Sequence, residues 1–215
     1  MKTYSSKLMT TIINSDDGTH NYEVTRTLED VEGDKAIVLM LYPSFSGQDL
    51  FRMDSTAMHM TNHLMNDLQI SSVKVINLFS KIVKGSKMSC RDAVVDEENL
   101  TYIENLMKQD DFEEYIFIVA WGNSMTKNKA AITAKERILE MHTQLHPTAK
   151  CYQFTCDGLP IKGNENVHPL YLGIRGASHL KWKLRPFSPA EYLKNAEVIE
   201  FKKPKPTAIA VKETK

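Results

Sequence analysis

Residues 39–51, LMLYPSFSGQDLF, contain the point at which a long apolar run stops in a turn. The run begins at residue 36 and reads AIVLMLY over residues 36–42, which is typical of a strand buried on both faces of a parallel sheet. Pro43 fixes its own φ and removes a backbone donor, so we expect the strand to end there. The turn contains neither nucleotide-binding glycine pattern, so it is either another kind of ligand-binding loop or a plain strand end.

The chain on either side alternates between strand-like and helix-like segments. Residues 8–28 predict a β-hairpin, because two β-rich stretches flank an Asp-Asp-Gly turn. Apolar spacing predicts helices at 55–68, 98–109 and 129–145 and strands at 72–79, 115–121 and 149–155. This alternation predicts an α/β fold, a three-layer α/β/α sandwich with a central, mainly parallel four-stranded sheet plus the N-terminal hairpin.

Length and composition fit one domain with a tail. The chain has 215 residues, of which 42% are hydrophobic. We expect a single domain over residues 1–200 and a basic, disordered tail over residues 201–215, because the tail has little to bury. The N-terminus lacks the apolar segment of a signal peptide, and no apolar run reaches the ~18–20 residues of a membrane span. An odd number of cysteines, three, fits a reducing compartment, so a cytoplasmic location is expected.

Charge is balanced overall but unevenly distributed. The chain carries 27 basic and 27 acidic residues, which argues against strong overall attraction to nucleic acid. Residues 175–185 nevertheless contain four basic side chains and no acidic one. Such a segment is either a basic face for phosphates or ordinary solvated surface, and the sequence leaves both readings open.

Two polar side chains fall where a ligand site is expected. In open α/β sheets the ligand crevice lies beyond the carboxyl ends of the strands. Asn77 lies near the end of the strand predicted at 72–79, and its amide either reads the edge of a flat heterocycle or fixes a neighbouring loop. His168 follows a polar loop and precedes Pro169, where it is either a site residue or an ordinary surface histidine.

The order of four short motifs resembles a bacterial family known as domain of unknown function 1643. The motifs are LYPS at 41–44, VINLF at 75–79, AWG at 120–122 and HPLYL at 168–172, and the pattern covers residues 22 to about 187. That family in turn resembles the uracil-DNA glycosylase superfamily. There, a proline loop after the first core strand positions water, a strand-end Asn recognises uracil, and a His-Pro segment supplies the catalytic His and a wedge residue.

The resemblance implies roles for individual positions. Asn77 matches the Asn that reads uracil, Pro43 the loop proline, and His168 the His that stabilises charge on the departing base. Tyr42 stands where active members have Asp or Asn, and a phenol is a poor general base near neutral pH. Asp49 is a candidate substitute for the missing carboxylate.

The same loop supplies further candidates for base binding. Ser44 stands where uracil-specific members have a bulky Tyr that excludes the methyl group of thymine, so base specificity is open. Phe45 or Phe51 is expected to stack on the base. The expected DNA contacts are Leu170, Leu172, Arg175, Lys181, Lys183, Arg185 and Lys127.

The function that the resemblance implies is removal of uracil from DNA. The base is flipped out of the stack and its N-glycosidic bond is hydrolysed, without a metal or cofactor. The implied partners are single- or double-stranded DNA that contains uracil, and a protein inhibitor of glycosylases, with the chain itself a monomer and no membrane partner. Two alternatives remain: a catalytically impaired module that binds nucleic acid or a nucleotide, which Tyr42 favours, and a nucleoside or nucleotide hydrolase.

Overall fold

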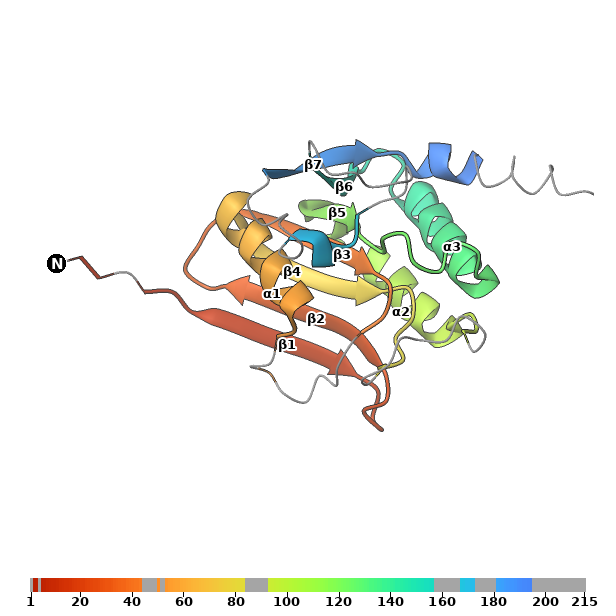
Figure 1. The fold of residues 1–215 in the computed structure, drawn as a ribbon, viewed down its shortest axis with the longest axis horizontal. Coiled ribbons are helices and arrows are strands. Elements are labelled where there is room, and N and C mark those ends of the chain that lie inside the picture. Colours follow the sequence, from red (N-terminus) through yellow and green to blue (C-terminus); the bar gives the residue numbers. More distant parts are fainter. Residues whose placement is uncertain are drawn as a thin grey trace, which may run out of the picture.

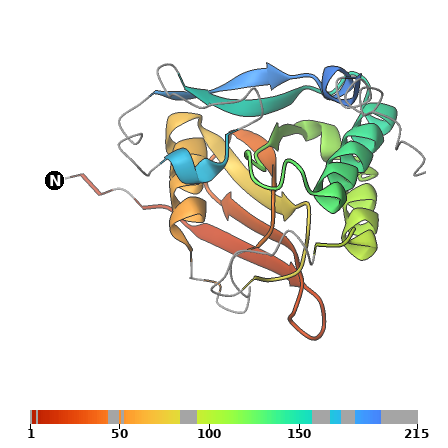
Figure 2. The same ribbon diagram turned by 45° about the vertical axis from the view of Figure 1, so that its right-hand side comes forward.

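The computed structural model describes residues 2–3, 5–43, 50, 53–83, 93–156, 167–172 and 181–194, which form a sheet with helices on both faces (Figures 1 and 2). The expected tail at 201–215 lies outside the described residues. The strands lie in the order β1-β2-β4-β3-β5-β6-β7. Their bounds are Leu8–Asn14 (β1), Asn21–Leu28 (β2), Asp34–Met40 (β3), Ile70–Asn77 (β4), Tyr115–Val119 (β5), Cys151–Cys156 (β6) and Trp182–Phe187 (β7).

The α/β class is confirmed, but the sheet is larger than the four strands expected. β4, β3, β5 and β6 run parallel, whereas β1, β2 and β7 pair antiparallel with their neighbours. The hairpin joins the sheet because β2 pairs with β4. β7 was not predicted, because half of its residues are exposed and its sequence, WKLRPF, mixes charges and a proline with its apolar residues.

The helices lie close to their expected positions. Their bounds are Ser55–Asn62 (α1), Glu97–Met107 (α2) and Lys129–Leu145 (α3), with a π-helical turn at His63–Asp67 (η1) and 3-10 turns at Phe112–Glu114 (η2) and Pro169–Leu172 (η3). Each α-helix begins at a side-chain cap, in which Asp54, Asp96 or Asn128 accepts a backbone N–H of the first turn. None of the described helices has the length and apolar character to cross a membrane.

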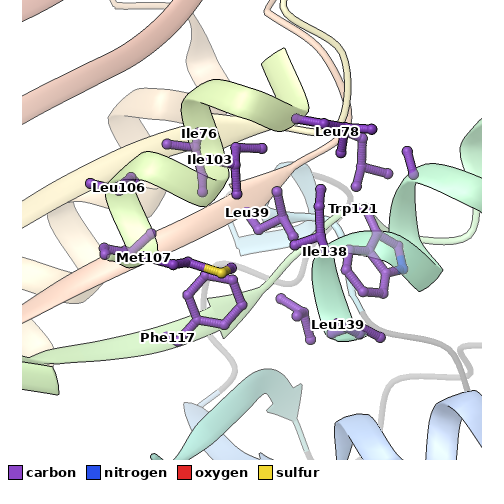
Figure 3. Close-up of a cluster of buried hydrophobic side chains, with 14 of the residues drawn as sticks. Leu39, Ile76, Leu78, Ile103, Leu106, Met107, Phe117, Trp121, Ile138 and Leu139 are labelled. Atoms are coloured by element: carbon purple, nitrogen blue, oxygen red, sulfur yellow. The ribbon is translucent and has the colours of Figure 1, made fainter. Parts of the chain in front are cut away.

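A hydrophobic core lies on each face of the sheet. On one face α2 and α3 cover Leu39, Phe117 and Trp121, as Figure 3 shows. On the other face α1, η1 and η3 cover Val38 and Ile118. Alternate side chains of β3 enter opposite cores, and both cores exclude water. Every position between the two cores therefore favours an apolar residue, which explains the continuous apolar run.

The parallel strands bring the predicted loops to one edge of the sheet, here called the carboxyl edge, where β3, β4, β5 and β6 end. Backbone pairing continues past the strand ends and fixes these loops. The N–H groups of Leu78 and Phe79 donate to Met40 and Leu41 at 2.9 and 3.2 Å, and Ala120 N–H donates to Leu39 at 2.8 Å.

Candidate functional site

A cavity of about 70 Å³ lies at the carboxyl edge, between β2, the ends of β3 and β4, and the start of α1. This volume is several times the roughly 10–15 Å³ that one water needs. A larger hollow of about 540 Å³, between α3 and the β6–β7 pair, lies at the opposite edge and contains none of the expected site residues. The cavity is lined by Asn21, Val24, Arg26, Met40, Tyr42, Pro43, Asp54, Ala57, Met60, Val75 and Asn77.

Asn77 lines the cavity and is held there through its backbone. The residue is 3% exposed. Its backbone carbonyl accepts a hydrogen bond from the side-chain amide of Asn99 at 2.8 Å, and the same amide reaches the carbonyl of Leu78 at 3.3 Å. Asn99, fully buried in α2, therefore fixes the end of β4 and leaves the Asn77 side chain to the cavity. Sequence reasoning missed Asn99, because an Asn near a helix start is usually a surface or capping residue.

Tyr42 and Pro43 also line the cavity, directly after β3. Both are half-buried, and Tyr42 additionally packs against the core beneath α2 and α3. The Pro43 carbonyl accepts the N–H of Val83 at 3.2 Å, which joins this turn to the segment after β4. The other loop candidates, Ser44, Phe45, Asp49 and Phe51, lie outside the described residues.

His168 is placed beside the end of β5 by a close backbone approach. Gly122, with φ +70°, leaves room for it, because a Cβ at this position would lie 2.6 Å from the His168 Cβ. The His168 Nδ1 accepts the N–H of Leu170 at 3.2 Å, so the proton of the neutral ring sits on Nε2. Burial lowers the pKa of His168, and the nearby Asp54 carboxylate offsets part of that effect. The ring is therefore a neutral hydrogen-bond donor at neutral pH.

Asp54 lines the cavity and acts electrostatically on His168. It caps α1 by accepting the N–H of Ala57 at 2.7 Å, and it also forms part of the cavity wall. Burial lowers the pKa of both His168 and Arg26, and the Asp54 charge offsets part of each shift, so this carboxylate lies within electrostatic reach of both side chains. Neither Asp54 nor Arg26 was expected at the site. An Asp just before a helix usually serves only as a cap, and a polar residue in a hairpin usually faces water.

The two leucines after His168 differ in exposure. Leu170 is 38% exposed, whereas Leu172 is 6% exposed and packs in the core beneath α1. Of the two, Leu170 is therefore the one whose side chain is available at the surface.

The basic candidates spread over two elements. Lys127 is exposed in the loop that follows β5. β7 runs antiparallel to β6, with Trp182 opposite Cys156, so Lys181 and Lys183 lie toward the carboxyl edge. Arg185 lies further along β7, opposite Gln153, whose side-chain oxygen accepts from the Arg185 Nε at 3.1 Å when the amide is turned to satisfy both groups. Arg175 lies outside the described residues.

The family model described as "Protein of unknown function (DUF1643)" matches residues 21–170 of the chain. The chain belongs to this family. No curated protein and no solved structure matches the sequence. The part of the chain that carries the DUF1643 match begins with β2 and includes every residue that lines the cavity, together with His168. The basic residues of β7 lie outside the match.

Proposed function

We propose that this protein is a DNA glycosylase that removes uracil from DNA by hydrolysing the N-glycosidic bond. The observation that carries the proposal is the arrangement at the carboxyl edge, where Asn77 lines a cavity and His168 lies beside the end of β5. A flat base edge matches the donor and acceptor of an amide such as that of Asn77. A neutral His with its proton on Nε2 can donate to a base oxygen as negative charge develops there.

The reaction needs little from a general base if the departing base is well stabilised. The bond between C1′ of the sugar and the ring nitrogen breaks, and both bonding electrons leave with the base. Water then adds its oxygen to C1′ and gives up a proton, which balances the negative charge of the departed base. Donors placed where the charge develops lower this barrier, and each donor typically raises the rate by a factor of about 10²–10³. Tyr42, in the place of the usual carboxylate or amide, is then compatible with a slower reaction.

Excision from a labelled oligonucleotide with one uracil, single-stranded or paired with G or A, tests the proposal. Abasic sites are revealed by alkaline cleavage, and thymine serves as the substrate control. We expect His168→Ala and Asn77→Ala to lower the single-turnover rate about 10²-fold or more, because each removes a donor to the base. His59→Ala and Asn66→Ala serve as matched controls, since neither residue lines the cavity. Normal excision by the first two variants would contradict the assignment.

A binding module without chemistry is the second candidate, and the position of Tyr42 on the cavity wall favours it. This reading predicts oligonucleotide binding by the wild-type chain without abasic product. Turnover of free nucleosides that is unaffected by loss of Lys181 and Lys183 would instead indicate a small-molecule hydrolase. Measuring binding, excision and nucleoside turnover on one preparation separates the three.

A further inference from the structure

Arg26 projects from β2 into the wall of the cavity and is only 3% exposed. Within the described part of the chain, its Nε has no hydrogen-bond partner. A guanidinium has five N–H donors in a planar fork and no acceptor. The cavity wall therefore contains a buried donor, the Nε–H of Arg26, that lacks an acceptor.

The needs of folding do not account for Arg26. Burying a charge without hydrogen-bond partners costs free energy, and well-packed apolar side chains of similar volume are often at least as stabilising as buried ionic groups. Burial lowers the pKa of Arg26, with partial compensation from Asp54, as expected for a cation withdrawn from water. A ligand that supplies acceptor atoms would satisfy this group.

The remaining cavity walls indicate the shape and charge of that ligand. Val24, Met40 and Val75 provide apolar surface, and the Asn77 amide lies on the same wall as Val75. Such walls suit a flat ring with a polar edge. The Asp54 carboxylate offsets part of the Arg26 charge, so a single delocalised negative charge is favoured over a doubly charged phosphate.

We propose that this cavity binds a pyrimidine base in its anionic form, with the Arg26 guanidinium donating hydrogen bonds to the carbonyl edge of the ring. That the ring is a pyrimidine rests on the proposed function, whereas the preference for a planar anion rests on Arg26 and the cavity walls. In the proposed reaction the base departs with the electron pair of the C1′–N bond, and it is this charge that Arg26 stabilises.

Calorimetric titration of the purified full chain at neutral pH tests this inference. The probes are barbiturate, a planar pyrimidine that is an anion at neutral pH, uracil, which is neutral, and inorganic phosphate, a tetrahedral anion. We expect the wild-type chain to bind barbiturate about tenfold or more tightly than uracil and not to bind phosphate. Arg26→Gln is expected to lose the preference for barbiturate, and Arg26→Lys to keep it in weaker form because the charge is retained.

Arg137→Gln is the matched control, because Arg137 pairs with Glu97 on the surface of α3 and α2, away from the cavity. Equal affinity for barbiturate and uracil in the wild-type chain, or an undiminished preference in Arg26→Gln, would overturn the proposal. So would phosphate binding that depends on Arg26. The excision assay separates the two proposals. If the chain prefers barbiturate but does not excise uracil, only the glycosylase assignment is contradicted. If the chain excises uracil but has no preference for barbiturate, only the role of Arg26 is contradicted.

Discussion

Glu23 and Arg26 are two charged side chains of β2 that are buried on opposite faces of the sheet. Glu23 is satisfied by the fold: it accepts from Tyr102 at 2.9 Å and Thr25 at 2.7 Å and lies 3.5 Å from the Nζ of Lys74. The Nε of Arg26 has no such partner among the described residues. The buried charge of Glu23 is therefore compensated within the fold, whereas the Nε–H of Arg26 is available to a ligand.

Gly122 is the residue whose replacement is expected to move His168 most directly. In Gly122→Ala the new Cβ would lie 2.6 Å from the Cβ of His168, so the histidine must shift. The positive φ of +70° adds a backbone penalty of about 1–2 kcal/mol. We expect both a loss of stability and a fall in excision of at least about tenfold, measured by urea unfolding and single-turnover assays.

Gly18→Ala separates these two effects. Gly18 has a similar φ of +65° but lies in the β1–β2 turn, far along the chain from His168. Gly18→Ala is expected to lose only the backbone part of that stability and to keep its excision rate. Equal loss of excision in the two variants would show that the Gly122 effect comes from stability and not from the position of His168.

α3 is held against the sheet by an aromatic cluster that includes a buried histidine. His142 is 2% exposed, and its ring centroid lies 5.0 Å from that of Phe117 and 6.2 Å from that of Phe112. Burial, together with the neighbouring His146, lowers the pKa of His142 to about 4. The folded protein thus holds this ring neutral where the unfolded chain would protonate it.

This packing predicts that acid weakens the attachment of α3. The pKa of His142 is about 4 in the folded state and near 6.5 in the unfolded state, so between these values the unfolded chain binds more protons and stability falls as the pH falls. We expect the loss of unfolding free energy between pH 7 and pH 5 to be smaller in His142→Leu than in the wild-type chain, by about 1–2 kcal/mol. Urea unfolding at both pH values measures this difference, and an identical pH dependence in the two proteins would contradict it.

The elements differ in how well the sequence predicted them. The helix at 129–145 matches α3, because seventeen residues of consistent periodicity and an Asn cap all favour a helix. The helix expected at 55–68 changes to a π-helical turn after Asn62, where His63 is buried and bonded to Asp67 at 2.7 Å. No local pattern distinguishes the two helix types, so this change follows from packing.

The whole molecule is electrically neutral, but three lysines lie at or near the carboxyl edge: Lys127 after β5, and Lys181 and Lys183 at the start of β7. If the proposed function holds, they meet phosphates on either side of the flipped base. Replacing each by Gln is expected to reduce the salt dependence of DNA binding by about one unit of slope in log K against log salt. Fluorescence anisotropy at several salt concentrations measures this slope.

Lys108→Gln is the control for that series. Lys108 follows α2, pairs with Glu104 at 2.6 Å, and is not part of the carboxyl edge. Its replacement is expected to leave the slope unchanged. An equal change in all four variants would indicate a general effect of net charge and not a binding surface at this edge.

The sequence by itself determined the α/β class, the hairpin at 8–28 and the strand ends at which Pro43 and Asn77 lie, because periodicity and turn residues are local properties of the chain. Its motifs also indicated the DUF1643 family. Only the tertiary structure decided that β2 and β7 extend the sheet, that Gly122 makes room for His168, and that Arg26 is buried at the cavity. The physical reason is that burial of a charge or a close backbone approach depends on segments distant in sequence, whose positions no local pattern encodes.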